Sequence, residues 1–324
     1  MSEYRIKQIG AEDFSVLIPL MKDCFGMEVN IDYFHWKYID NPAGSFLGFI
    51  AIHNTTEEVG AYYGVIPQKL FIEGIERTIF QSCDTMTHSA HRRKGLFKML
   101  ALACYEHLRS TNQLFIIGYG GADSTPGFLK FGWKHVFNFR YSFVPNLLCK
   151  LKGWPGLYKP EHFSNTPSEI MLNTVLKNIP TLKTIHSART SEHILWRTKN
   201  NNYTYEFVFY KNTEQCDSYA IYYIHNNNLI LFDFFFATPK SKKAILWQLS
   251  RQVSSKKLKG IIAYCQENGS KEKELRKSLF LYNPFKKGPL SERTPFIFYS
   301  DEETIQKYNL PAQWSMTSYD HDAL

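Results

Sequence analysis

The sequence lacks the features that mark several large classes of protein. Its six cysteines are scattered and no two form a C-x-x-C pair, which argues against a zinc site or a disulfide framework and for a reducing compartment. No apolar run reaches the roughly 18 residues that a membrane-spanning helix needs. The first residues are charged and lack the apolar core of a signal peptide. We therefore expect a cytoplasmic protein with no metal and no membrane partner.

Signatures of nucleotide and nucleic-acid binding are missing as well. There is no G-x-x-x-x-G-K-[ST] motif, so a P-loop nucleotidase is not expected. Zinc-finger spacing and the aromatic signature of RNA-recognition domains are also absent, and we expect no nucleic-acid partner. The formal net charge is nevertheless +8. Such a charge fits a phosphate-bearing small ligand, an anionic surface, or simply a solvated basic face, and composition leaves these readings open.

The composition provides for a packed core. The chain has 324 residues, of which 44% are hydrophobic and 16% aromatic, enough for two domains of ordinary size. Apolar residues at helical spacing predict a helix over Ala11–Gly26 and another after Gly95. Alternating and buried patterns, bounded by Gly and Asn, predict strands. These strands are expected over Ser45–Asn54, Glu58–Gly74, Thr78–His88 and Gln113–Gly121.

The second half of the sequence repeats motifs of the first half in the same order. At one offset of 160 residues, Trp36, Lys37 and Asn41 correspond to Trp196, Arg197 and Asn201. Further on, "DTMTHSA" from Asp84 corresponds to "DFFFATP" from Asp233, and "LFIIGY" corresponds to "GIIAYC". A period of this length indicates duplicated domains rather than a solenoid. We expect one domain over 1–150, a Pro- and Gly-rich linker over 151–170 and a second domain over 171–324.

Three basic residues and a glycine stand between a strand pattern and a helix pattern in "TMTHSAHRRKGLFKML", which runs from Thr85 to Leu100. A glycine that opens a helix lets the backbone approach a ligand, and the first-turn amides together with the helix dipole favour a phosphate there. Arginine side chains add forked donors. The stretch therefore predicts a diphosphate-binding loop, and the alternative is a basic, solvated turn.

These residues carry a resemblance to a known family. Arg92-x-x-Gly95 after a strand, with a helix following, resembles the coenzyme A pyrophosphate loop of the GNAT N-acyltransferase superfamily, and "GFLKFGW" (Gly127–Trp133) resembles its second motif. The resemblance implies an α+β GNAT fold with mixed, splayed central sheets. It implies tandem GNAT-like domains, of which the second is degenerate because it has nothing like "HRRKG". Phe97, Phe128 and Gly121 depart from the family pattern.

The resemblance also implies an activity and its residues. Acyl-coenzyme A would be the cosubstrate, and an amine would attack its thioester directly. The general base would be Asp84 or His88, and the amide of Thr85 would face the thioester oxygen. Asp84 could instead be a structural aspartate, and His88 a helix-entry histidine. Residues expected to contact coenzyme A are Met86, Thr87, Arg92, Arg93, Lys94, Gly95, Leu96, Phe97 and Ser124. Residues expected to contact the acceptor are Gln81, His35 and Tyr63.

Three functional readings follow. "WKYIDNPAG", "DTMTHSAHRRKGLF" and "PGFLKFGW" together are similar to bacterial two-domain N-acyltransferases that act on dTDP-linked 3-amino-3,6-dideoxyhexoses for surface polysaccharides, with an acetyl or 3-hydroxybutyryl donor. The acceptor would then be a nucleotide-linked amino sugar. A GNAT enzyme acting on an amino acid or peptide is an alternative, and so is a coenzyme A-binding protein without turnover. The protein is expected to be a monomer or a homodimer.

Overall fold

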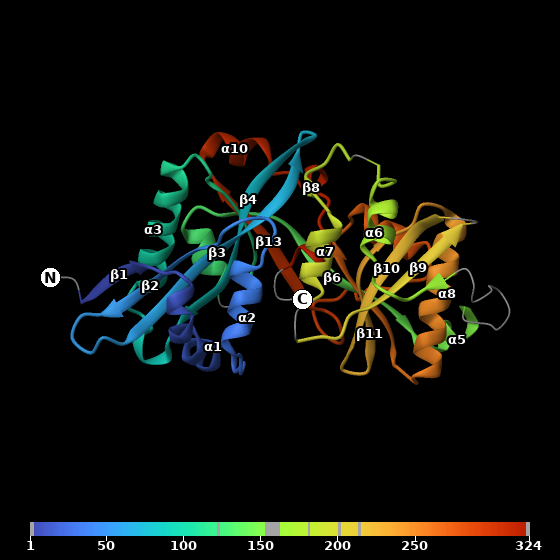
Figure 1. Cartoon of the computed structure of the whole chain (residues 1–324), viewed down its shortest axis with the longest axis horizontal. Helices are drawn as coiled ribbons and strands as arrows, with labels where there is room; N and C mark the ends of the chain where they lie inside the picture. Colours follow the sequence, from blue (N-terminus) through green and yellow to red (C-terminus); the bar gives the residue numbers. More distant parts are fainter. Residues whose placement is uncertain are drawn as a thin grey trace. The chain divides into compact units, whose positions relative to one another are not determined.

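The computed structural model of the chain describes residues 3–121, 124–152, 163–180, 182–199, 202–212 and 215–321. They form two compact units (Figure 1). Unit 1 comprises Met1–Leu70, Glu76–Val136 and Pro295–Leu310, and unit 2 comprises Phe71–Ile75, Phe137–Thr294 and Pro311–Leu324. Each unit contains its own sheet segment with helices on both faces.

The sheet of unit 1 is mixed. Its strand order is β1 (Tyr4–Gln8), β2 (Leu47–His53), β3 (Val59–Ile72), β4 (Ile75–Thr87), β5 (Phe115–Tyr119) and β13 (Arg293–Ser300). β4 and β5 are parallel, whereas β1–β2, β2–β3 and β5–β13 are antiparallel. The four strands predicted between Ser45 and Gly121 are therefore present, with ends that shift by one to three residues.

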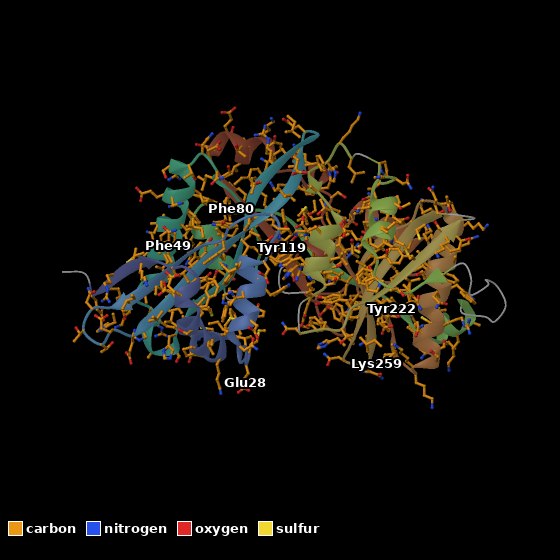
Figure 2. The ribbon with its side chains drawn as sticks, viewed as in Figure 1. Glu28, Phe49, Phe80, Tyr119, Tyr222 and Lys259 are labelled. Carbon is orange, nitrogen blue, oxygen red and sulfur yellow. The ribbon has the colours of Figure 1, made fainter. Side chains whose placement is uncertain are left out.

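Two apolar clusters cover the two faces of this sheet. On one face, α3 (Leu96–Ser110) and α4 (Thr125–Lys130) pack on side chains that include Phe49 and Phe80, both labelled in Figure 2. On the other face lie a 3₁₀ helix (Ala11–Val16), α1 (Leu17–Phe25), α2 (Ile31–Phe34) and a π-helical turn (His35–Ile39). The helix predicted to end at Gly26 does so, because Gly26 has φ +66° and its N–H bonds to the carbonyl of Lys22. α10 (Glu302–Lys307) completes the unit.

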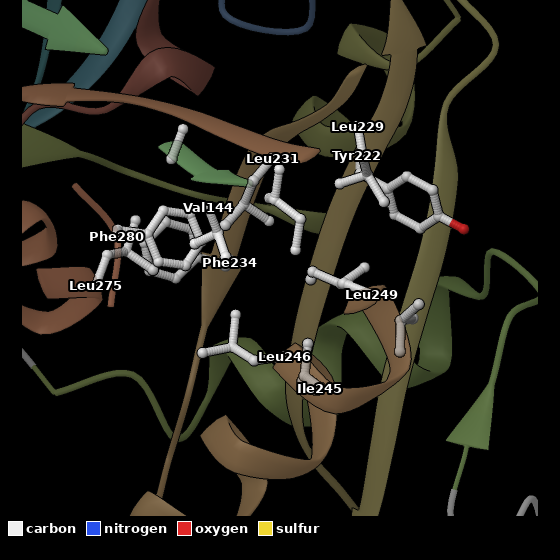
Figure 3. Close-up of a cluster of buried hydrophobic side chains, with 14 of the residues drawn as sticks. Val144, Tyr222, Leu229, Leu231, Phe234, Ile245, Leu246, Leu249, Leu275 and Phe280 are labelled. Atoms are coloured by element: carbon white, nitrogen blue, oxygen red, sulfur yellow. The ribbon is translucent and has the colours of Figure 1, made fainter. Parts of the chain in front are cut away.

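Unit 2 is built on the same plan. Its strand order is β6 (Lys134–Pro145), β12 (Gly260–Gln266), β11 (Asn228–Phe235), β10 (Gln215–His225), β9 (Glu206–Asn212) and β7 (Phe163–Ser164). α5 (Asn146–Lys152) and α8 (Pro239–Ser255) lie on one face, over the cluster drawn in Figure 3. α6 (Glu169–Leu176) and α7 (Ser191–Arg197) lie on the other. The short elements β8 (His186–Ser187), Pro311–Gln313 and Ser318–Asp320 also belong to this unit.

The element order confirms the repeat that the sequence predicts. β2-β3-β4-α3-β5-α4 in unit 1 corresponds to β9-β10-β11-α8-β12-α9 in unit 2, where α9 spans Ser270–Arg276. The fold is therefore α+β and of the GNAT type, in tandem. Asn201, one of the residues that indicated the repeat, lies outside the described residues.

The two halves of the sequence exchange one strand. β13, from the second half, pairs with β5 in unit 1, and β6, from the first half, pairs with β12 in unit 2. Arg140 anchors β6 in unit 2, because its guanidinium bonds to the fully buried carboxylate of Glu272 and to Glu267. For this reason the compact units do not follow the predicted boundaries of 1–150 and 171–324. Much of the expected linker over 151–170 lies outside the described residues, since 153–162 are not among them.

Candidate functional site

The central strands of unit 1 diverge after a short parallel ladder. Phe80 pairs with Ile116 and Gln81 with Ile117. β13 pairs with the other edge of β5 along its whole length, from Phe115 to Tyr119. Within the described residues, β4 therefore has no ladder partner in β5 from Ser82 to Thr87. Backbone groups that a neighbouring strand does not use are available to an extended ligand. The splayed arrangement expected from the sequence is thus present at the carboxyl end of β4.

An irregularity marks β4 within this stretch. Asp84 has φ +47°, an uncommon value for a residue with a side chain. Cys83 and Met86, three positions apart, both join the same apolar cluster, whereas an undisturbed strand would alternate faces. A β-bulge with this geometry re-aims the backbone and is over-represented next to active sites. Thr85, whose amide is predicted to face the thioester oxygen, directly follows it.

Asp84 is engaged on both of its carboxylate oxygens. The ammonium of Lys37 lies 2.9 Å from Oδ1 and 2.8 Å from Oδ2, and the Tyr38 hydroxyl donates to Oδ2 at 2.7 Å. Lys37 is 2% exposed. A buried ammonium needs such a counter-charge. These contacts support the structural reading of Asp84 over its reading as a base.

The counterpart of Asp84 in unit 2 has the same kind of partners. Asp233 is 1% exposed, accepts from the guanidinium of Arg189 at 3.1 and 3.2 Å, and accepts from the hydroxyl of Tyr219 at 2.6 Å. The Asp–cation–tyrosine set therefore occurs in both units. Because unit 2 lacks the basic loop, the set does not by itself indicate catalysis.

His88 directly follows β4 and is held by local contacts. Its Nδ1 accepts the N–H of Ala90 at 3.2 Å, and its Nε2 lies 3.9 Å from Oδ1 of Asp23. Asp23 also accepts from the backbone N–H and the hydroxyl of Ser89, and these bonds lower the pKa of Asp23. Asp23 thus fastens the start of the basic loop to α1. No local sequence pattern indicates this contact, because Asp23 and Ser89 are far apart along the chain.

The basic loop lies between β4 and α3 and presents two arginines to solvent. Arg92 and Arg93 are exposed, Arg93 has φ +65°, and Gly95 has φ +76° with open space where a side chain would begin. The first backbone bond of α3 runs from Met99 N–H to Gly95 O. The N–H groups of the preceding turn, Leu96 included, are therefore available to an anion. Arg92 makes one long contact, 3.4 Å from Nε to the carbonyl of Thr87.

Lys94, unlike Arg92 and Arg93, forms an ion pair within the protein. Its ammonium lies 2.5 Å from the carboxylate of Glu3 and over the ring of Tyr4. The hydrogen bond from Lys94 lowers the pKa of Glu3. Of the three basic residues predicted to contact coenzyme A, Lys94 is therefore already paired in this structure, and the two arginines carry the available charge.

The family departures Phe97 and Phe128 pack against each other. Their ring centroids are 4.9 Å apart, and Phe97 also lies against Tyr63 and Phe131. A Cβ atom at Gly127 would meet the ring of Phe97 at 3.1 Å. Phe128 is 5% exposed and has no proton to donate. Ser124, half-buried, precedes α4 without a side-chain capping bond.

The residues predicted to contact the acceptor are not gathered at one surface. Gln81 and Tyr63 are fully buried, and Gln81 accepts from the side-chain amide of Gln68. The structure therefore does not support either as an acceptor contact, and both belong to the core. His35 is half-buried and packs edge-on against Phe14.

Among the described residues, no group of three or more His, Cys, Asp or Glu side chains could hold a metal ion. Across the same residues, every helix is too short or too polar to span a bilayer.

A comparison with protein families finds a match over the part of unit 1 that contains the basic loop. Residues 5–136 match the family model described as an acetyltransferase (GNAT) domain, a range that runs from the second residue of β1 to the start of β6. The sequence matches no curated protein sequence. The match and the geometry agree that unit 1 has the GNAT fold.

Solved structures resemble nearly the whole chain. A probable N-acyltransferase of unknown function from Enterococcus faecalis V583 is similar with a TM-score of 0.72 and 12% identity, over 95% of this chain and 75% of that one. A GCN5-related N-acetyltransferase from Anabaena variabilis has a TM-score of 0.67 and 10% identity, over 91% and 72%. Saccharomyces cerevisiae N-myristoyltransferase with bound myristoyl-CoA has a TM-score of 0.58 and 11% identity, over 93% and 79%. At these identities the likeness concerns the fold.

Proposed function

We propose that the protein is an acyl-CoA-dependent N-acyltransferase whose donor site lies in unit 1. The observation that carries this proposal is the continuous run of three features: the unpaired edge of β4, the loop with exposed Arg92 and Arg93, and the free amides that open α3 after Gly95. An extended pantetheine would bond to the edge of β4, and the diphosphate would bind at the loop. The match of residues 5–136 to the GNAT family supports the same reading.

The reaction is a direct transfer. A neutral acceptor amine attacks the thioester carbonyl carbon, a C–N bond forms, the C–S bond breaks, and coenzyme A leaves as the thiolate while the new amide loses a proton to a base. The bulge at Asp84 leaves Thr85 next to the diverging strands, where its amide would stabilise the developing oxyanion. Much of the rate would come from positioning.

The contacts of Asp84 and the identity of Phe128 limit which residues could act as the general base and the general acid. Asp84 already neutralises Lys37, and Phe128 cannot protonate the leaving sulfur. His88, directly after β4, remains as the candidate base, with its Nε2 3.9 Å from Oδ1 of Asp23, and solvent water would relay the proton. A coenzyme A thiolate leaves without strict need of a positioned acid, and Ser124 is one hydroxyl near the start of α4.

For the acceptor we propose a nucleotide-linked amino sugar, on the basis of the sequence resemblance. The diphosphate of such an acceptor would add a second demand for positive charge, in keeping with the net charge of +8. An amino acid or peptide acceptor keeps the same donor site and differs only in the second substrate.

Free-thiol release tests the activity and the acceptor together. Acetyl-CoA and 3-hydroxybutyryl-CoA are offered with dTDP- and UDP-linked amino sugars and, in parallel, with amino acids and short peptides. Release that depends on one amino sugar supports the full proposal, and release that depends on a peptide or amino acid moves the acceptor assignment. Binding of coenzyme A without release from any acceptor in the panel would contradict the enzymatic reading and favour a non-catalytic coenzyme A-binding protein.

A further inference from the structure

In unit 2 the place that corresponds to the diverging strands is occupied by the chain itself. The parallel ladder of β11 and β12 covers Leu229–Leu231 and Ile261–Ala263. Beyond it, Thr317 forms a backbone bridge with Cys265 of β12, and the hydroxyl of Ser318 donates to the carbonyl of Phe232 in β11. The segment Ser315–Asp320 thus fills the position between the two strands, and unit 2 has no open edge there for a pantetheine.

A cavity of about 310 Å³ lies beside this segment, entirely within unit 2. Its volume is within the range of small-molecule sites. Apolar atoms form most of the exposed wall, although half of the residues that line it are polar. The apolar residues are Phe71, Leu176, Ile179, Pro180, Leu182, Phe234 and Phe235, and the polar ones are His186, Ser187, Arg189, Tyr219, Lys271, Ser315 and Thr317.

Lys271 is the uncompensated charge of this cavity. Its ammonium donates to the carbonyl of Phe234 at 2.9 Å and lies 4.5 Å from the centre of the Phe234 ring. The carboxylates of Glu274 and Asp233 act on it electrostatically, but Lys271 forms no ion pair with either of them or with another carboxylate among the described residues. Burial lowers the pKa of Lys271, as expected for an ammonium that lacks a full counter-charge. The carbonyl takes one of the three N–H bonds of the ammonium, and the rings of Phe234 and Phe235, 4.5 and 5.8 Å from Nζ, do not provide a hydrogen-bonding oxygen for the others.

Arg189, the other strongly basic residue in the wall, already has a counter-charge. Arg189 is held by Asp233 on two nitrogens and also donates to the hydroxyl of Thr317 at 2.8 Å. Its charge is neutralised within the protein. A bound anion would therefore form its ion pair with Lys271. Arg189 has a structural role in the cavity wall, because Asp233 and Thr317 hold its guanidinium.

We propose that this cavity binds a small organic acid with an apolar body, whose carboxylate or phosphate pairs with Lys271. The carboxylate or phosphate would supply the counter-charge that the protein does not provide, and the body would contact Leu176, Ile179 and Phe235. A nucleotide fits less well, because a volume of about 310 Å³ is at the lower end of the range for small-molecule sites. The site is distinct from the donor site of unit 1 and does not depend on the proposed function.

Calorimetric titration of the full chain with octanoate and with octyl phosphate tests the proposal, the two acids separating a carboxylate from a phosphate headgroup. We expect at least one to bind with a Kd at or below about 1 mM. Lys271→Met should weaken binding roughly tenfold or more, which is the loss of one charge-assisted contact. Lys273→Met, at an exposed position of the same helix, should leave the Kd unchanged.

A second variant covers the case in which Lys271→Met does not fold. Ile179 is half-buried in the wall, and Ile179→Glu should abolish binding of both acids by placing a like charge beside them. Arg92→Ala should leave their binding unchanged, which separates this site from the donor site. Absence of binding by both acids, equal binding to Lys271→Met, or Lys271-dependent binding of dTDP with neither acid bound would overturn the proposal.

Discussion

Lys37 and Asp84 form an ion pair in the core of unit 1, with Nζ 2.8 Å from Oδ2 and with side chains 2% and 10% exposed. The pair joins the π-helical turn to the bulge of β4, and so fixes the bulge beside the proposed thioester position. Removal of one partner of a buried pair costs far more than the pair itself contributes, because the other charge is left buried alone.

We therefore predict that Asp84→Asn lowers the free energy of unfolding by about 3–5 kcal/mol, and that adding Lys37→Met to it restores most of the loss. Urea unfolding measures both. Glu28→Gln, which breaks the exposed pair of Lys22 and Glu28, should change the stability by less than about 0.5 kcal/mol. A stable Asp84→Asn variant that has lost all thiol release would instead identify Asp84 as the base.

We predict that Gly95 matters more for coenzyme A binding than for the stability of the fold. Gly95→Ala and Gly26→Ala meet the same conditions, since both positions have positive φ (+76° and +66°) and no atom within 4 Å of an added Cβ. Each should cost about 1 kcal/mol of stability through backbone strain. Only Gly95→Ala should also weaken coenzyme A binding, because strain relief there moves the first-turn amides. Equal coenzyme A affinity in both variants would contradict the role of the loop.

Cys24 should be the thiol that reacts with Ellman's reagent in the native protein. It is half-buried, whereas the other five cysteines are buried. Burial raises the pKa of Cys24, so the reactive thiolate is scarce at neutral pH and the labelling rate should keep rising as the pH passes the ordinary thiol pKa. Guanidinium should expose all six thiols. Fast labelling of several native thiols would contradict the burial of the other five cysteines. Cys24→Ser should remove the protein's own thiol signal from thiol-release assays.

The strand exchange predicts which fragments fold. Residues 1–150 keep β6, which belongs to unit 2, and lack β13, the neighbour of β5. This fragment should not unfold cooperatively, because β5 would present an unpaired edge. A chain that joins 1–136 to 293–310 through a flexible linker should show a cooperative transition. Circular dichroism during urea titration distinguishes the two, and cooperative unfolding of 1–150 alone would contradict the exchange.

Local patterns predicted the elements well. Periodicity located α3, and the glycine and asparagine punctuation located β2 to β5, because these signals act within a few residues. The tandem repeat also followed from the sequence. The domain boundaries did not, because the partners of β6 and β13 are chosen by long-range pairing that leaves no mark in the strand sequences themselves.

The site was predictable in part for the same reason. The arginines and Gly95 share one loop, so their neighbourhood could be inferred from their spacing. The partners of Asp84, the anchoring of Ser89 by Asp23 and the burial of Gln81 and Tyr63 depend on contacts between distant segments. The assignment of these side chains to catalysis or acceptor binding therefore could not be decided before the fold was known.

The most direct test of the account is a calorimetric titration of coenzyme A into the wild-type protein and into Arg92→Ala/Arg93→Ala. Arg109→Ala, an exposed position at the far end of α3, is the matched control. The account predicts binding to the wild type, a loss of at least about tenfold in the double variant, and no change in the control. Absence of binding to the wild type, or the same affinity in all three proteins, would mean that the loop is a solvated basic turn.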